Sequence, residues 1–303
     1  MAWAWPRRRS TPDAAARYCS AGPQSRRVEN PHEVRGFAVT SRGPLKSEDV
    51  LSRLVLEARQ DLQRRRHLMG SDQLELAVAA YTPRDFIGAL RKPGLAVIAE
   101  MKQRTPSMGV LAEDYRPADI AHAYTDGGAS AISVLTHMAG FGGRPEHIRM
   151  VRAATEVPVL RKDFVTDPYE VAEARACGAD AVLLIVAALE PSQLRDLVAL
   201  TKSRGLAALV EVHDEAETHA ALEADAHAIG VNHRNLRDFS VDLGLTERLR
   251  KLVPENVVLV AESGIHTPAD ARRLREAGAD AILVGEALMR SADPAAQISE
   301  LLG

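Results

Sequence analysis

The chain has 303 residues, of which 46% are apolar, and its formal net charge at pH 7 is −3 with an isoelectric point near 6.4. This length and a mean hydropathy of −0.15 indicate a globular protein with one large domain or two smaller ones. The slightly acidic charge argues against nucleic acid as a main partner. The two cysteines, Cys19 and Cys177, lack metal-ligand spacing, so we expect neither a disulfide framework nor a metal site. No apolar run is long enough to cross a bilayer, and the expected compartment is the cytoplasm.

Residues 1–44 differ in composition from the rest of the chain. They contain eight Arg against three acidic residues, five Pro, and no sustained apolar periodicity. Such a segment buries too little apolar surface to offset its ordering entropy, so we predict a disordered N-terminal extension. An Arg-rich leader is also compatible with an organelle transit peptide, but the segment lacks a clear amphipathic helix. We therefore favour an inert extension or a misplaced start codon.

The regular part of the chain begins after Lys46 with an expected amphipathic helix. Ser47 is a suitable N-cap for this helix. The apolar residues that follow recur at helical spacing, at Leu51, Leu54, Val55, Ala58 and Leu62. We expect this helix, which starts at about Val50, to cover the bottom or the rim of the fold that follows it.

After Gly94, short apolar runs alternate with amphipathic segments. We interpret eight of these runs as strands, at 95–101, 131–136, 157–164, 181–187, 207–213, 228–232, 257–263 and 281–288. The segments between them, such as DPYEVAEARACG and TPADARRLREAG, have helical spacing, and several end in Gly. The phrase GADA recurs at Gly178 and Gly278, each time before an apolar run, which is typical of repeated βα units.

Eight strands that alternate with helices are compatible with a closed (β/α)8 barrel or an open doubly wound sheet. The count of eight and the roughly 210 residues from Leu95 onward favour the barrel. No G-x-G-x-x-G motif follows the first strand, which weakens the dinucleotide-binding version of the open sheet. We predict an α/β protein, a (β/α)8 TIM barrel with an extra N-terminal helix, whose catalytic domain covers residues 45–303.

The active site of such a barrel lies at the C-terminal ends of the strands. Polar residues follow most of the predicted strands, at Glu100 and Lys102, Lys162 and Asp163, Glu211, Asn232 and Arg234, and Glu262. Each of them alone is compatible with a surface charge or a structural ion pair. Glu100, Glu211 and Glu262, however, follow buried-strand sequence, where an unpaired carboxylate is unfavourable. We therefore expect these side chains to meet at one mouth as acid–base pairs.

Two strand ends also predict a phosphate site. Ser263 and Gly264 follow the seventh strand, and Gly285 and Glu286 begin a short helix after the eighth. Barrels often bind phosphate at this corner through backbone N–H groups and a helix N-terminus. One glycine alone is weak support because turns commonly contain glycine, but the two motifs together are more specific.

The same residues carry a likeness to a known family. The segments VIAEMKQRTPSMG, PVLRKDF, GADAVLLIVAAL, LVEVHDEAE, IGVNHRNL, VAESGI and LVGEALMRS resemble indole-3-glycerol phosphate synthases in order and spacing. The likeness covers residues 46–303. It implies a lyase of tryptophan biosynthesis that needs no cofactor. The substrate would be 1-(2-carboxyphenylamino)-1-deoxyribulose 5-phosphate, and the products indole-3-glycerol phosphate, carbon dioxide and water.

The resemblance implies a role for each site residue. Lys162 is similar to the general acid that protonates the substrate carbonyl oxygen, Glu211 to the acid–base partner in the dehydration, and Lys102 to the lysine near the substrate carboxylate. The other implied roles are tuning of the lysines by Glu100, contacts to substrate hydroxyls by Asn232 and Glu262, binding of the anionic end by Arg234, and binding of the phosphate by Ser107, Ser263, Gly264, Gly285 and Glu286.

Chemistry adds two expectations for this substrate. Its aromatic ring needs an apolar slot, which we assign to Pro106, Phe141, Phe164 and Leu183. Proton delivery by Lys162 suggests a partly desolvated amine among other cations, with a lowered pKa. Next to it, we expect Arg161 to face the helices or a partner charge and Asp163 to be an orienting or structural carboxylate.

The chain departs from the family pattern mainly in the loop after the second strand. His137 stands where an acidic residue is usual, and Arg144 stands where Ser is usual. Outside this loop, Thr105 replaces a Ser, and His233 stands where a small or amide residue is common. The loop changes are compatible with altered rate or substrate tolerance, and equally with neutral drift in an exposed loop.

Three functional hypotheses follow. The first is an indole-3-glycerol phosphate synthase. The second is a paralogue that closes a substituted indole in secondary metabolism, and the third is an inactive barrel that binds a phosphorylated ligand. Lys162 and Glu211 count against the third. The expected partner is a small phosphorylated molecule, with no nucleic acid or membrane, and both a monomer and a homodimer are compatible with the sequence.

Overall fold

The computed structural model describes residues 50–78, 81–106, 108–235 and 240–303. The predicted extension 1–44, the suggested cap Ser47 and the suggested phosphate ligand Ser107 lie outside the described residues. Within the described ranges, no helix is both long and apolar enough to span a membrane.

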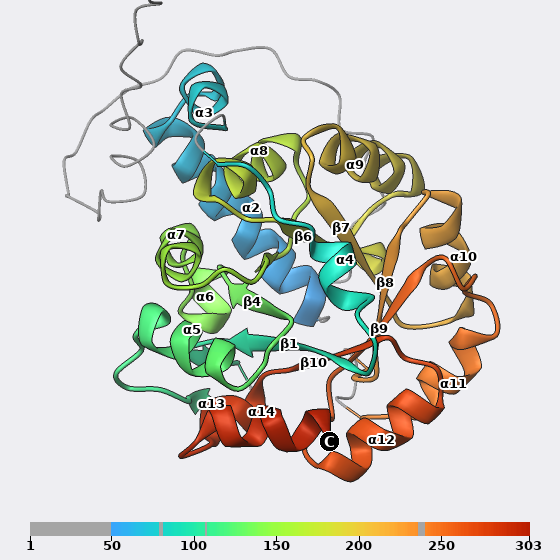
Figure 1. Cartoon of the computed structure of the whole chain (residues 1–303). Helices are drawn as coiled ribbons and strands as arrows, with labels where there is room; N and C mark the ends of the chain where they lie inside the picture. Colours follow the sequence, from blue (N-terminus) through green and yellow to red (C-terminus); the bar gives the residue numbers. More distant parts are fainter. Residues whose placement is uncertain (1–49, 79–80, 107, 236–239) are drawn as a thin grey trace, which may run out of the picture.

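Eight parallel strands form a closed barrel at the centre of the molecule (Figure 1). They are β1 Ala96–Met101, β4 Ala131–Leu135, β5 Val159–Lys162, β6 Ala181–Ile185, β7 Ala207–Val212, β8 Ala228–Asn232, β9 Val258–Glu262 and β10 Ala281–Val284. Each strand pairs with the next in chain order, and β10 closes the barrel by pairing with β1, where Ala281 lies opposite Ala96. The prediction of a (β/α)8 barrel is therefore confirmed, and each of its eight strands falls within a predicted run.

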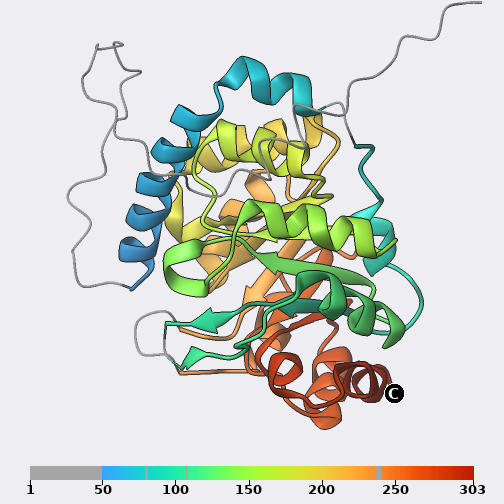
Figure 2. The same ribbon diagram turned by 90° about the vertical axis from the view of Figure 1, so that its left-hand side faces the viewer.

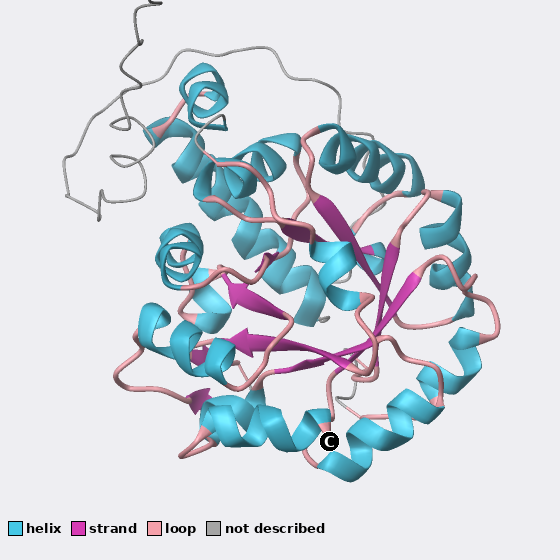
Figure 3. Cartoon of the chain, in the orientation of Figure 1, coloured by secondary structure: helices cyan, strands magenta, loops and turns pink. Residues whose placement is uncertain are grey.

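Helices surround the strands on the outside of the barrel (Figure 3). Those that follow β1 are α5 Pro117–Asp126, α6 Met138–Phe141, α7 Pro145–Ala154, α8 Pro168–Cys177, α9 Pro191–Ser203, α10 Glu215–Glu223, α11 Leu245–Arg250, α12 Pro268–Glu276, α13 Glu286–Arg290 and α14 Pro294–Leu302. A short 3-10 turn, η1 Val186–Ala188, follows β6. This order of strand, helix, strand is the arrangement that the repeated βα units predict.

Local sequence explains where many of these helices begin. Proline is found in the first turn of several of them. Backbone N–H groups in the first turn have no partner within the helix, so a residue without an N–H is tolerated there. Side chains just before the first turn then accept from free backbone N–H groups. Asp167 accepts from Tyr169 N at 2.8 Å, and Thr267 and Asp270 form a capping box on α12. Glycine ends α8, since Gly178 has φ of 90°.

Among the described residues, three helices precede the barrel: α2 Val50–Leu68, α3 Ser71–Val78 and α4 Phe86–Leu90. The apolar residues predicted for the first helix are the buried residues of α2. Val50, Leu51 and Leu54 line the cavity described below, so the start of α2 lies at the rim of the barrel mouth. Figures 1 and 2 show α2 (blue) beside the strands and α3 beyond the barrel wall. The bottom is covered instead by α4, whose Phe86 packs against the interior cluster.

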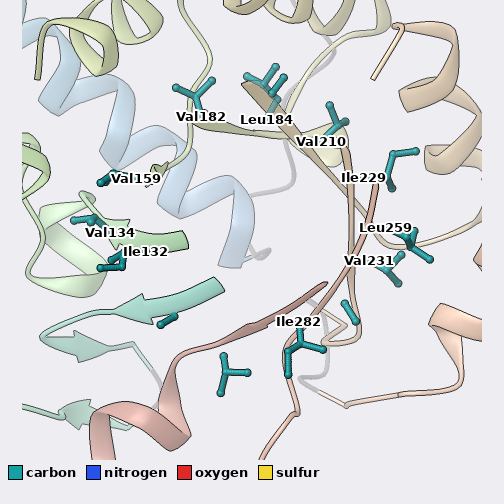
Figure 4. Close-up of a cluster of buried hydrophobic side chains, with 14 of the residues drawn as sticks. Ile132, Val134, Val159, Val182, Leu184, Val210, Ile229, Val231, Leu259 and Ile282 are labelled. Carbon is teal, nitrogen blue, oxygen red and sulfur yellow. The ribbon is translucent and has the colours of Figure 1, made fainter. Parts of the chain in front are cut away.

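Side chains on each strand alternate between two apolar clusters, as the period of two along a strand requires. The inward cluster fills the barrel and includes Ile98, Leu160 and Leu209. The outward cluster lies between the strands and the helices, and ten of its members are labelled in Figure 4. Because the strands are buried on both faces, they read as continuous apolar runs in the sequence.

The structure differs from expectation at several strand ends and in one added element. The run predicted at 281–288 ends as a strand at Val284, because Gly285 precedes the helix α13. A short antiparallel hairpin, β2 Arg104–Thr105 and β3 Gly109–Val110, follows β1 and was not anticipated. This hairpin includes Pro106, one of the residues predicted for the ring slot.

Arg161 and Asp163 have structural roles, as expected. Arg161 is fully buried, and its guanidinium donates to Asp163 Oδ2 at 3.0 Å and to Glu173 Oε2, on α8, at 2.8 Å. Asp163 Oδ1 accepts from the backbone N–H of Phe164 at 2.9 Å. These bonds anchor the end of β5 to α8, and they hold Lys162 and Phe164 on the opposite side, toward the mouth.

Candidate active site

A cavity of about 220 Å³ opens at the C-terminal ends of the barrel strands. It is lined by every predicted site residue that the structure describes, namely Glu100, Lys102, Pro106, Phe141, Lys162, Phe164, Leu183, Glu211, Asn232, Arg234, Glu262, Ser263, Gly264, Gly285 and Glu286. They come from seven of the strands or the residues just after them, from the hairpin after β1 and, for Phe141, from α6 after β4, so the barrel brings them together. Ser107 lies outside the described residues.

The acid–base residues lie at the C-terminal ends of their strands. Asn232 lies opposite Glu262 between β8 and β9, and Glu211 lies opposite Gly230 between β7 and β8. Glu211 and Glu262 follow the inward-facing Leu209 and Val260 by two positions, so both point into the barrel, and all three residues line the cavity. Their positions above the apolar interior separate them from most of the solvent.

Lys162 contacts two of the three glutamates. Its Nζ donates to Glu211 Oε2 at 3.0 Å and lies 3.4 Å from Glu262 Oε2. Burial alone favours the neutral amine, but the surrounding carboxylates, with Glu211 first, outweigh burial and raise the pKa of Lys162 above its usual value. The expectation of a lowered pKa was therefore wrong, because carboxylates rather than cations are its dominant neighbours.

Glu211 and Glu262 differ in protonation although both are buried. Burial and the like charges of neighbouring carboxylates raise the pKa of Glu262 to about 8, although Lys162 opposes this rise. Burial also acts on Glu211, but the charges of Lys162 and His213 prevail and lower its pKa. Asn232 adds a hydrogen bond from Nδ2 to Glu211 Oε1 at 3.1 Å. Near neutral pH this pair therefore consists of an ionised Glu211 and a protonated Glu262.

The second lysine of the site, Lys102, forms an ion pair with Glu100. Both residues are on the inward face at the end of β1, since they are two positions apart. Gly285 lies against this pair: a Cβ at that position would be 2.6 Å from Glu100 Oε1 and 2.9 Å from Lys102 Nζ. Because Gly285 has no Cβ, the ion pair can occupy the space beside its backbone.

The corner after β9 and β10 has the backbone expected of an anion site. Ser263 and Gly264 are consecutive residues with φ of 69° and 75°. Left-handed conformation is unusual for serine, and it turns the chain sharply at the cavity wall. Gly285 and the N-terminus of α13 lie at the same cavity, while the Glu286 carboxylate pairs with Arg290 at 3.4 Å. Only the backbone of Glu286 is therefore suited to an anion.

His233 supports this corner, a role that the sequence did not suggest. Its Nδ1 lies 3.0 Å from the carbonyl oxygen of Ser263, and its Nε2 lies 2.7 Å from Thr246 Oγ1. Burial lowers the pKa of His233. A neutral ring that donates from Nδ1 to Ser263 and accepts from Thr246 satisfies both contacts. His233 thus links the end of β8 to the turn after β9.

The apolar slot is built from aromatic rings. Phe141 on α6 and Phe164 after β5 line the cavity, with ring centroids 6.5 Å apart. His137 packs edge-on against Phe164 at 5.1 Å, is 4% exposed, and accepts through Nδ1 from Gly140 N. Neutral drift in an exposed loop is therefore the wrong interpretation for His137. Arg144 is exposed, as that interpretation requires.

Two residues beside the site were missed. His213 follows Glu211 by two positions on the same side of β7, and its Nε2 lies 3.5 Å from Glu211 Oε1. Its Nδ1 lies 3.0 Å from Glu217 Oε2, in the first turn of α10. The signals in the sequence are the E-x-H spacing at the strand end and a Glu four residues later, which together place a histidine between two carboxylates.

The fold and the site define a class, the (β/α)8-barrel enzymes with a lysine–carboxylate group at the mouth. No group of three His, Cys, Asp or Glu residues in the described part of the chain is arranged to hold a metal ion. The family model described as indole-3-glycerol phosphate synthase matches residues 51–301. The chain belongs to this family, and the resemblance inferred from its motifs is confirmed.

Curated relatives match over most of the chain. Indole-3-glycerol phosphate synthase 2 of Streptomyces coelicolor is 59% identical over 255 residues, which are 84% of this chain and 99% of that protein. The synthase of Mycobacterium sp. strain KMS is 48% identical over 85% of this chain and 95% of its own length. The synthase of Dehalococcoides mccartyi strain CBDB1 is 46% identical over 84% of this chain and its whole length.

Solved structures of lower similarity share the fold. Thiamine phosphate pyrophosphorylase from Pyrococcus furiosus superposes with a TM-score of 0.54 at 21% identity, over 68% of this chain and 93% of that one. N-acetylmannosamine-6-phosphate 2-epimerase from Clostridium perfringens superposes with a TM-score of 0.53 at 17% identity, over 67% and 90%. These two likenesses concern the barrel alone.

Proposed function

We propose that the chain is an indole-3-glycerol phosphate synthase, a carbon–carbon lyase of tryptophan biosynthesis. It converts 1-(2-carboxyphenylamino)-1-deoxyribulose 5-phosphate to indole-3-glycerol phosphate, carbon dioxide and water. Family membership supports the reaction, and the observation that carries it is Lys162 between the buried carboxylates of Glu211 and Glu262, 3.0 Å and 3.4 Å away. Such a group supplies both a proton donor and a proton acceptor to one substrate.

The order of steps is inferred from family membership, and Lys162 and Glu211 are assigned to these steps by their charge. The aryl carbon attacks the substrate carbonyl carbon, and Lys162, charged because its pKa is raised, donates a proton to the carbonyl oxygen as the carbon–carbon bond forms. Loss of carbon dioxide restores the aromatic ring. Glu211, which is ionised, then acts as the acid–base partner while water leaves.

The remaining site residues bind and orient the substrate. Lys102, paired with Glu100, is assigned to the substrate carboxylate, and Asn232 and Glu262 are assigned to substrate hydroxyls. Arg234 is assigned to the anionic end. The phosphate is assigned to Ser107 and to the corner formed by Ser263, Gly264, Gly285 and the backbone of Glu286, and the aromatic ring to the slot of Pro106, Phe141, Phe164 and Leu183.

We also infer the domain bounds, the partner, the compartment and the oligomeric state of the enzyme. We assign the barrel domain to residues 45–303 and the N-terminal extension to residues 1–44. The net charge of −3 supports a small-molecule substrate rather than nucleic acid as the partner. We expect the enzyme to work in the cytoplasm, as a monomer or a homodimer, without a cofactor.

The test is turnover by the purified chain. The carboxyphenylamino ribulose phosphate is added, and indole fluorescence and released carbon dioxide are followed together. We expect the two products in equal amounts. Folded protein that binds a phosphorylated analogue but forms no indole would instead support the inactive barrel. Turnover of only ring-substituted substrates would support the paralogue.

A further inference from the structure

His213 lies between two carboxylates from different elements. Its Nε2 is 3.5 Å from Glu211 Oε1, and its Nδ1 is 3.0 Å from Glu217 Oε2. Within the described part of the chain, the buried Nε2 has no hydrogen-bond partner. When the ring is charged, the proton on this nitrogen has one carboxylate within ion-pair distance, that of Glu211.

The start of α10 fixes the outer carboxylate. Asp214 caps this helix by accepting from Glu217 N at 2.8 Å. Glu217 Oε2 in turn accepts from the backbone N–H of His213 at 2.8 Å, in addition to its contact with the ring. The backbone N–H and the imidazole of His213 thus share the Glu217 carboxylate, which fixes the orientation of the ring.

Two charged side chains and one amide from three further elements surround this group. Lys162 Nζ, on β5, donates to Glu211 Oε2, on β7, at 3.0 Å, which is the carboxylate oxygen that does not face His213. Glu262 on β9 also acts on His213, and Asn232 on β8 donates to Glu211. Burial disfavours the charged imidazole, but Glu217, Glu211 and Glu262 outweigh burial and raise the His213 pKa.

We propose that His213, held by Glu217, is a positioning residue that keeps Glu211 ionised and oriented for the dehydration step. The inference deepens the proposed function and depends on it for the catalytic consequence. Lys162 holds one oxygen of Glu211, and the His213 ring faces the other. Positive charge on these two neighbours of the buried carboxylate favours its ionised form, which leaves Glu211 free to accept a proton from the substrate.

The first test is the pH dependence of kcat/KM in His213→Asn, Glu217→Gln and His219→Asn. His219 is exposed and lies on α10, the helix that contains Glu217, so it serves as the matched control. Loss of the imidazolium raises the Glu211 pKa, so we expect the acidic limb of the profile to move up by about 1 pH unit in His213→Asn, with about tenfold lower activity below that limb. In Glu217→Gln the acidic limb should move by a smaller amount, because the His213 imidazole is still present. KM and the His219→Asn profile stay unchanged.

The second test does not need turnover. In protein with 15N-labelled histidine, the His213 ring is titrated by NMR in the wild type and in Glu211→Gln. We expect the His213 pKa to fall by about one pH unit when the Glu211 charge is removed. Identical titration in the two proteins, or an unmoved acidic limb in His213→Asn, would overturn the inference. If the wild type forms no indole, the proposed function fails, and this titration alone decides whether His213 and Glu211 are coupled.

Discussion

The ammonium of Lys162 lies 3.0 Å from Glu211 Oε2, and the side chains of both residues are largely shielded from water. Burial strengthens their attraction, since less water screens the two charges. The same contact keeps the lysine charged and the carboxylate ionised, which prepares one as a donor and the other as an acceptor. The relationship therefore links the fold to the reaction, because β5 and β7 lie on either side of β6 and the curvature of the barrel turns their inward faces toward each other.

Gly285→Ala tests the packing around the Lys102–Glu100 pair. The new Cβ would be 2.6 Å from Glu100 Oε1, so the pair has to move. We expect kcat/KM to fall by about tenfold or more while the thermal midpoint changes little, because a displacement of about 1 Å at a reacting centre is enough for that loss. Gly70→Ala is the control, as no atom lies within 4 Å of the Cβ that it adds. Full activity in Gly285→Ala would argue against a role for this pair.

Glu262→Gln tests the raised carboxyl pKa through stability. A carboxyl whose pKa is about 8 when folded and 4.5 when unfolded binds more protons in the folded state. The free energy of unfolding therefore falls as pH rises from 4.5 to 8, by an amount on the order of a few kcal/mol. Chemical denaturation at several pH values should show this fall in the wild type and in the exposed control Glu247→Gln, and a flatter dependence in Glu262→Gln. Parallel curves for all three would mean that Glu262 is ionised in the folded protein.

His137→Ala tests the aromatic slot. The substitution removes the ring that packs against Phe164 and the acceptor for Gly140 N. We expect a loss of about 1 to 3 kcal/mol in the free energy of unfolding. The space beside Phe164 should also raise kcat/KM for ring-methylated substrate several-fold relative to the unsubstituted one. His122→Ala, exposed on α5, is the control. An unchanged ratio would show that His137 has no influence on substrate tolerance.

Removal of residues 1–44 tests the domain assignment. The family match begins at residue 51, after this segment. Steady-state kinetics of the shortened chain should match those of the full chain within about twofold, as expected where no site residue is lost. A large decrease in kcat/KM would show that the extension contributes to the active barrel.

Much of the fold and the site could be predicted from the sequence, for a physical reason. Strands buried on both faces read as continuous apolar runs, so a carboxylate such as Glu211 or Glu262 at the end of a run is conspicuous. Barrel closure then converts separate strand ends into one mouth, which is why the cavity contains the site residues that were expected. Ion pairs within one strand, such as Lys102 with Glu100, follow from the period of two.

Properties that depend on distances between elements could not be predicted in this way. The pKa of Lys162 depends on how near three carboxylates from other strands lie, and the sequence alone suggested the wrong direction. The burial of His137 depends on the short helix α6, which begins at the next residue and folds back over the loop. The link from Glu217 through His213 to Glu211 depends on how α10 docks beside β7, and sequence spacing alone does not specify that docking.

The most direct test of the central claim, that Lys162 is the proton donor, is single-turnover formation of indole by Lys162→Ala beside wild type and the exposed control Lys251→Ala. We expect Lys162→Ala to lose activity by about 10²- to 10⁴-fold or more, while it binds a phosphorylated product analogue as the wild type does. Lys251→Ala, whose side chain is exposed, should remain fully active. Indole formation in Lys162→Ala at a rate close to that of the wild type would show that Lys162 is not the proton donor.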